Sequence, residues 1–232
     1  MSWPPELLRT APRIGLGLAA LGRPAYITTD RQAELGPDRS VESLRQRTDE
    51  VLDAAYEAGV RYIDVARSYG LAENFLAGWL QRRGLTAAEI VVGSKWGYTY
   101  VGSWRMFDAV QTTWNLLEPS SADTLAKAHA AGMTVIVKEA LANGRLTDAG
   151  DQPALVRAAA ARGLSTDNLA ISAALAQPWV DIVLSGAVTV ETLRSNLAAS
   201  AAHWDSELNE LAAALAIQAP VYWDERARRS WT

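Results

Sequence analysis

The chain has 232 residues, of which 49% are hydrophobic and 21% are charged, and its formal net charge is −4. This balance excludes a disordered or fibrous protein, and without any block of basic residues it gives no footprint for nucleic acid or a membrane surface. With no cysteine and only two histidines, the sequence also excludes a disulfide framework, a thiolate nucleophile and a classical zinc site.

Apolar runs typical of strands alternate with helical patterns along the chain, and this alternation predicts parallel strands joined by crossover helices. The six predicted strands cover 14–20, 60–65, 90–95, 107–113, 133–138 and 181–185. Helical spacing and glycine stops predict helices over 40–59, 72–84, 121–132 and 167–177, and two further helices close the chain. No linker or low-complexity segment interrupts the sequence, so we expect a single domain over residues 1–232.

Polar residues gather where the predicted strands end, at Asp64, Lys95, Asn115, Glu139 and Ser185. In a (β/α) barrel these ends form one face, where loops build the active site. The apolar runs are too short to span a bilayer, and the start of the chain lacks the pattern of a secretory signal. We therefore expect a cytoplasmic protein whose partners are small molecules or proteins, and not nucleic acid or a membrane.

The segment "YIDVARSYGLAENFLAGWL" resembles the aldo-keto reductase family, with Asp64 at a strand end, then Tyr69 and a glycine, then a Glu-x-x-Leu helix. Lys95 in "VVGSKWG", Gln111 and Asn115 in "AVQTTWNLLEPS", and the stretch "VLSGAVTVETLRSNLAA" match further parts of the family pattern in the same order. The resemblance implies an α/β fold of the TIM-barrel type. It also implies an NAD(P)H-dependent oxidoreductase that reduces a small-molecule carbonyl.

The resemblance assigns catalytic roles to Asp64, Tyr69 and Lys95. A phenol is a poor acid at neutral pH unless a nearby cation stabilises its phenolate, and Lys95 would be that cation. Tyr69 would donate the proton to the carbonyl oxygen, while Asp64 would pair with Lys95 and orient it. Taken singly, these residues are better explained by a helix cap, surface packing and a solvated charge, so the assignment depends on their combined order and spacing.

Cofactor-binding residues follow from the same resemblance: Gln111, Trp114, Leu141, Gly144, Gly186, Ala187, Thr189 and Asn196. The implied cofactor is NADPH, with NADH as the alternative, because Gly186 and Thr192 stand where many relatives place a lysine and an arginine for the 2′-phosphate. Trp114 is equally well explained as a core residue.

The aromatic loop after Lys95 carries three predicted substrate-binding residues, Trp96, Tyr98 and Trp104. They suit an apolar or aromatic carbonyl compound at the mouth of a barrel, or they cover an open edge of a shortened core.

Two strand-helix units of the family have no counterpart between Lys95 and residue 107, so the barrel is expected to be incomplete, with about six units instead of eight. The family's active-site histidine and the Ser-Asn pair that holds the nicotinamide carboxamide are among the missing parts. Three explanations stay open: an omitted segment, a true deletion, or a scaffold adapted to another role. We therefore expect nucleotide binding at the adenosine end with impaired hydride transfer, or, as the alternative, a non-catalytic barrel that binds a ligand or a protein. Unpaired strand edges also make a homo-oligomer plausible.

Overall fold

Six parallel strands form one curved sheet in the computed structural model, which describes residues 5–23, 25, 37–95, 108–201 and 203–230. The strands are β1 (Ile14–Gly17), β2 (Tyr62–Asp64), β3 (Val91–Gly93), β4 (Ala109–Thr113), β5 (Thr134–Lys138) and β6 (Ile182–Ser185). Each is shorter than predicted, and residue 107 lies outside the described residues, but all six predicted strands are confirmed.

The sheet is an incomplete barrel with the strand order β3-β2-β1-β6-β5-β4. β1 pairs in parallel with both β2 and β6, so the first and last strands meet in the middle of the sheet. Within the described residues, β3 pairs only with β2 and β4 pairs only with β5, which leaves these two strands as the edges. The break in the barrel therefore lies between β3 and β4, where the sequence pattern loses two units.

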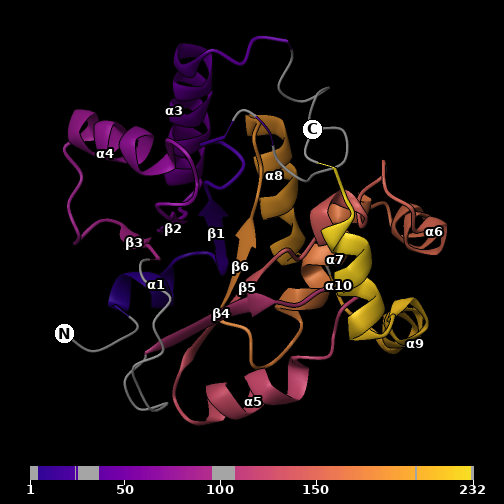
Figure 1. Cartoon of the computed structure of the whole chain (residues 1–232). Helices are drawn as coiled ribbons and strands as arrows, with labels where there is room; N and C mark the ends of the chain where they lie inside the picture. Colours follow the sequence, from indigo (N-terminus) through magenta and orange to yellow (C-terminus); the bar gives the residue numbers. More distant parts are fainter. Residues whose placement is uncertain (1–4, 24, 26–36, 96–107, 202, 231–232) are drawn as a thin grey trace.

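Helices cover the outer side of the sheet (Figure 1). The helices of the described residues are α1 (Glu6–Thr10), α3 (Val41–Glu57), α4 (Ala72–Arg83), α5 (Ala122–Ala130), α6 (Pro153–Ala161), α7 (Thr166–Leu175), α8 (Val190–Ala198), α9 (Ser206–Leu215) and α10 (Ala219–Ala227). The four helices predicted over 40–59, 72–84, 121–132 and 167–177 are confirmed as α3, α4, α5 and α7. The expectation of two closing helices was wrong, because three follow β6, and α1 and α6 were not predicted at all.

Local sequence signals explain where the helices begin and end. Ser40 caps α3 by accepting a hydrogen bond from the backbone N–H of Ser43 at 3.2 Å. Gly84 ends α4 in the left-handed region with φ of 66°, a conformation that costs glycine little. None of the helices in the described part of the chain is long and apolar enough to cross a membrane.

Apolar side chains bury both sides of the sheet. One core cluster joins β1 and β2 to α3, α4 and α8, and a second packs α5 to α10 around β5 and β6. A small third cluster consists of Tyr62, Ile136, Ile182 and Leu184, and Leu8 of α1 packs against it. This arrangement leaves the carboxyl ends of the strands uncovered by the core clusters, and the candidate site lies there.

Candidate active site

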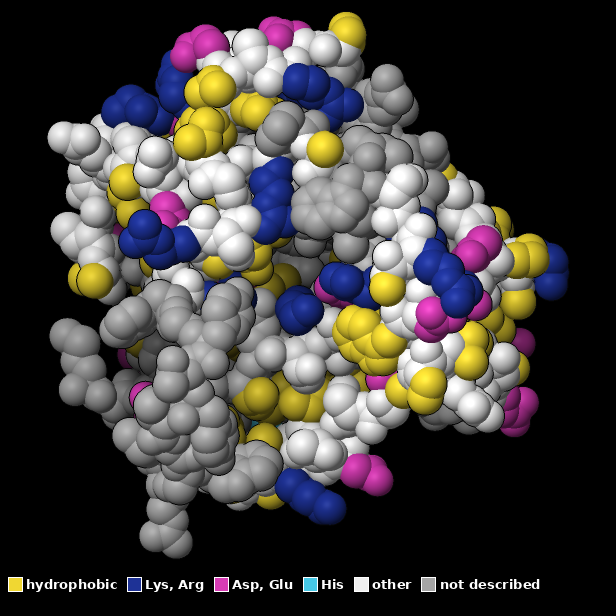
Figure 2. Space-filling model, viewed as in Figure 1, with side chains coloured by type: hydrophobic (Ala, Val, Ile, Leu, Met, Phe, Trp, Pro, Cys, Tyr) yellow, Lys and Arg dark blue, Asp and Glu magenta, His cyan; other side chains and the backbone are white. Residues whose placement is uncertain are grey.

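A cavity of about 680 Å³ lies at the carboxyl ends of the strands. Its wall comes from the loop after β1, the ends of β2 and β4, the loops after β5 and β6, and helices α7, α8 and α10. The space-filling view shows a hollow near the middle of the molecule with basic side chains around it (Figure 2). The lining is more apolar than polar, which is usual for a small-molecule site with a few orienting polar groups.

Asp64, Tyr69 and Lys95 meet at one end of this cavity. The Lys95 Nζ lies 2.5 Å from the Asp64 Oδ1, and the Tyr69 hydroxyl donates to the Asp64 Oδ2 at 3.3 Å. Asp64 ends β2 and is only 3% exposed, whereas the Lys95 side chain, two residues past β3, is 38% exposed. The structure thus brings the three predicted catalytic residues together, with Asp64 and Tyr69 lining the cavity and Lys95 in contact with both of them.

Burial and the charge of Asp64 act against ionisation of the Tyr69 phenol. Burial raises the pKa of Asp64, although Lys95 partly offsets this effect. Burial and then the negative charge of Asp64 raise the pKa of Tyr69 well above its ordinary value. The ion pair that the sequence argument expected between Lys95 and Asp64 is present. The lowered pKa that it expected for Tyr69 is not, because burial and the charge of Asp64 raise that pKa.

A second cation faces Tyr69 and was not predicted from the sequence. The Arg23 guanidinium lies 5.1 Å from the centre of the Tyr69 ring, comparable to the 4.9 Å of the Lys95 Nζ, and its charge acts to lower the pKa of Tyr69. Two glycines allow this close approach: a Cβ on Gly22 would lie 2.3 Å from the Tyr69 carbonyl oxygen, and one on Gly70 would lie 2.3 Å from the Gly22 carbonyl oxygen. No sequence motif marks Arg23, because the contact joins two loops.

The loop after β5 carries a strained backbone and a buried ion pair. Glu139, Ala142 and Asn143 all have positive φ, which is uncommon outside glycine. The Glu139 side chain is 9% exposed and receives two hydrogen bonds from Arg226 of α10, at 2.9 Å and 2.5 Å. Burial acts to raise the pKa of Glu139, but Arg226 and Lys138 hold that pKa below its usual range. Arg226 was missed because it comes from the last helix.

The cavity wall includes six of the eight predicted cofactor-binding residues: Gln111, Leu141, Gly144, Gly186, Ala187 and Asn196. Three features of these residues fit a bound nucleotide. A Cβ on Gly186 would meet no atom within 4 Å, so the glycine leaves open space for a ligand. The Asn196 Oδ1 is buried without a hydrogen-bond partner among the described residues. The Gln111 Nε2 likewise makes no hydrogen bond of ordinary geometry to a described residue, although Gln111 lies near enough to Asp64 to help lower the pKa of that carboxyl.

Two predicted cofactor residues, Trp114 and Thr189, lie outside the cavity wall. Trp114 is 5% exposed and packs edge-on against Trp179, with ring centres 5.8 Å apart, so its indole belongs to the apolar core. Thr189 caps α8 by accepting a hydrogen bond from the Thr192 N–H at 3.1 Å. The predicted substrate-binding residues Trp96, Tyr98 and Trp104 lie outside the described residues.

Comparison with known proteins shows which family this chain resembles in sequence. The model of the aldo/keto reductase family matches residues 13–106, a segment that contains Asp64, Tyr69 and Lys95. No curated protein gives a significant match.

Within the described residues, no group of three or more histidine, aspartate or glutamate side chains could hold a metal ion.

Solved structures share the fold. An aldo-keto reductase from Klebsiella pneumoniae in complex with NADPH has a TM-score of 0.64 at 17% identity, with 88% of this chain and 91% of that chain covered. A thermostable aldo-keto reductase in complex with the inhibitor epalrestat has a TM-score of 0.68 at 18% identity, covering 91% of this chain and 98% of that one. For an apo aldo-keto reductase from Bacillus halodurans, the TM-score is 0.58 at 18% identity, with 79% and 89% covered. The resemblance to aldo-keto reductases is thus confirmed, in sequence over residues 13–106 and in fold over most of the chain.

Proposed function

We propose that the chain is an NAD(P)H-dependent oxidoreductase that reduces a small-molecule carbonyl compound with Tyr69 as the general acid. One observation carries the proposal: Tyr69, Asp64 and Lys95 meet at one end of a cavity whose remaining wall holds the residues matched to nucleotide binding. The family match over residues 13–106 and the shared fold support an oxidoreductase of this general kind.

Tyr69 is suited to hold the proton that the reaction needs. Because its pKa is raised, the phenol stays protonated throughout the neutral range and can donate to the oxygen of a bound carbonyl group. When bound, the reduced nicotinamide supplies the hydride that reaches the carbonyl carbon. Arg23, which faces the ring of Tyr69, acts to lower the pKa of the phenol and so stabilises the phenolate that remains after proton transfer.

Asp64 and the nucleotide-matched residues position the reactants. Asp64 fixes the Tyr69 hydroxyl and the Lys95 ammonium relative to each other through its two carboxylate oxygens. The buried amides of Gln111 and Asn196 supply polar atoms toward the cofactor, and Gly186 leaves room for it. We propose a slow reaction, because the family's histidine has no counterpart and the raised pKa of Tyr69 makes proton donation costly.

The test is the Tyr69→Phe variant, assayed for carbonyl reduction and for nucleotide binding by fluorescence titration. Deleting the hydroxyl removes the proton donor but keeps the ring, so the reduction rate should fall by about 10²- to 10⁴-fold while nucleotide affinity stays within about threefold. Tyr56→Phe is the matched control, since Tyr56 lies on α3 outside the cavity wall. Reduction by Tyr69→Phe at the unmodified rate would remove Tyr69 from the mechanism.

A cavity that binds a ligand without reducing it is the second candidate, and the raised pKa of Tyr69 favours it. Tight nucleotide binding with no reduction of a panel of aldehydes and ketones would support this reading. The two edge strands also lead us to propose self-association, which sedimentation of the purified chain tests directly.

A further inference from the structure

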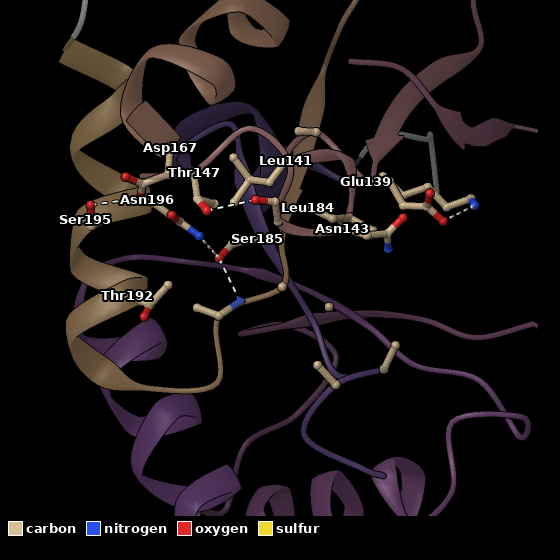
Figure 3. A pocket seen from close by; sticks show the side chains of 18 of the residues that line it. Glu139, Leu141, Asn143, Thr147, Asp167, Leu184, Ser185, Thr192, Ser195 and Asn196 are labelled. Atoms are coloured by element: carbon tan, nitrogen blue, oxygen red, sulfur yellow. Dashed lines mark hydrogen bonds and ion pairs between the residues drawn. The ribbon is translucent and has the colours of Figure 1, made fainter. Parts of the chain in front are cut away.

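The end of the cavity farthest from Glu139 is built from the first turns of two helices. Asp167 belongs to the first turn of α7 and Glu191 to the first turn of α8, and both line the cavity together with Asp148. In the close view, Asp167 and Ser195 lie at one end of the pocket and Glu139 at the other (Figure 3). Three carboxylates thus lie on the wall at or beside this end.

Hydrogen bonds fix two of these carboxylates in place. The Ser195 hydroxyl of α8 donates to the Asp167 Oδ2 at 2.9 Å, so this bond ties α8 to α7. Asp148 accepts hydrogen bonds from the hydroxyl of Thr166 and from its backbone N–H, the latter at 3.4 Å. Both acidic groups are therefore parts of the wall, held by named donors.

An unsatisfied polar atom marks this end as a ligand site. Asn196 is 0% exposed and lines the cavity, and its Nδ2 donates to the Ser185 hydroxyl at 2.8 Å. Its Oδ1 is buried with no hydrogen-bond partner among the described residues. A buried acceptor without a donor costs free energy, so a ligand that donates a hydrogen bond here would recover that cost.

The basic residues of the wall are engaged elsewhere. Arg23 stacks on the ring of Tyr69, and Lys138 and Arg226 contact Glu139 at the other end. Among the described residues that line the cavity, these three are the only lysines or arginines. The side chains that line the Asp167 end therefore carry a surplus of negative charge.

We infer that the cavity binds a dinucleotide whose adenosine ribose carries a free 2′-hydroxyl, NADH in preference to NADPH, with Asp167 and Glu191 as specificity-determining residues. The inference rests on the proposed function, because placing the hydride donor beside Tyr69 directs the adenosine toward α7 and α8. A carboxylate can accept a hydrogen bond from a ribose hydroxyl, whereas a 2′-phosphate brings like charge to the same place. No described lysine or arginine lines this end to neutralise that phosphate.

Isothermal calorimetry on the purified chain tests the inference without any turnover. We expect NADH to bind roughly tenfold or more tightly than NADPH at low salt. 5′-AMP should likewise bind better than adenosine 2′,5′-bisphosphate, and this pair tests the adenosine end alone. Because like-charge repulsion is screened by ions, both preferences should shrink as salt is added, which a purely steric rejection would not show.

Variants that remove or reverse a negative charge test whether Asp167 and Glu191 cause the preference for NADH. In Asp167→Asn with Glu191→Gln, the preference for NADH should fall to within about threefold. Glu191 is exposed, so Glu191→Lys threatens the fold little and should by itself improve NADPH binding. Asp123→Asn is the matched control, since Asp123 is the acidic residue in the first turn of α5 and lies outside the cavity wall.

The outcomes separate this inference from the proposed function. NADPH binding as tightly as NADH, or a preference that Glu191→Lys and the double variant leave unchanged, overturns the inference and leaves the oxidoreductase proposal standing. Binding of neither dinucleotide overturns both. A preference for NADH that weakens with salt and in the double variant, but not in Asp123→Asn, establishes the assignment.

Discussion

Replacing Lys95 by methionine tests how the buried carboxylate of Asp64 is stabilised. Breaking a fully buried ion pair by removing one partner typically costs about 3–5 kcal/mol. Here Asp64 is 3% exposed but the Lys95 side chain is 38% exposed, so water already screens part of the interaction. We therefore expect Lys95→Met to lower the free energy of unfolding by about 2 kcal/mol at pH 7.

The loss of stability in Lys95→Met should become smaller as the pH falls. Burial raises the pKa of Asp64 in the folded state, and the loss of Lys95 raises that pKa further. The folded variant then binds a proton more readily than the unfolded chain, so its stability relative to the unmodified protein should recover as the pH falls from 7 toward 5. At pH values above the pKa of Asp64 in the folded variant, the full loss of stability remains.

Urea unfolding followed by circular dichroism at pH 7 and pH 5 measures both effects. The double variant Asp64→Asn with Lys95→Met should return to within about 1 kcal/mol of the unmodified protein, because no charge is left buried. Lys127→Met removes an exposed lysine of α5 and should change stability by less than about 0.5 kcal/mol. A cost below about 0.5 kcal/mol for Lys95→Met, or a double variant no more stable than the single one, would refute the reasoning.

Three further predictions concern the cavity and its surroundings. Gly186→Ala should leave thermal stability unchanged while weakening dinucleotide binding in calorimetry about tenfold, because a Cβ there would meet no protein atom and would enter the ligand space; a loss of stability with unchanged binding would contradict this. Tyr222→Phe should cost about 1 kcal/mol in urea unfolding, since it removes the 3.1 Å hydrogen bond from the Asn115 amide, which keeps its bond to the Glu139 carbonyl oxygen; unchanged stability would be the contrary result. The rate of carbonyl reduction, measured against pH, should show no loss through deprotonation of Tyr69 below about pH 10, because the pKa of Tyr69 is raised; a fall near pH 8 attributable to Tyr69 would count against the assignment.

The strands were predictable because they are short runs rich in apolar residues, and five of the six, β2 to β6, have a polar residue at or just after their end. Asp64 could be placed beside Lys95 from the sequence, since the ends of neighbouring parallel strands lie at one face of the sheet. Helix α6 was missed, although "PALVRAAAA" has a proline at its first position and several alanines, both of which favour a helix. The role of Trp114 was not decided by the sequence, because an indole suits both a core and a cofactor, and its packing against Trp179 favours the core.

The electrostatics of the site could not be predicted in the same way. Arg23 reaches Tyr69 from a loop, and Arg226 reaches Glu139 from a helix 87 residues away in the chain. Neither contact follows from a motif, because each depends on how loops and helices pack in space. The direction of the pKa of Tyr69 was therefore wrong in the sequence argument, which considered one cation and left out the burial of the phenol and the charge of Asp64.

The pairing of β1 with β6 has a consequence for how the chain folds. It divides the sheet into two three-stranded halves, β1 to β3 and β4 to β6, each built from strands close in sequence. The seam between the halves instead joins residue 14 to residue 183, a contact that must close about three quarters of the 232-residue chain into a loop. Contacts of such long range form slowly because the entropy of loop closure is lost before the contact is gained. We therefore expect the two halves to acquire structure first and the seam to join them last, so that the cavity, which takes its wall from both halves, exists only once folding is complete.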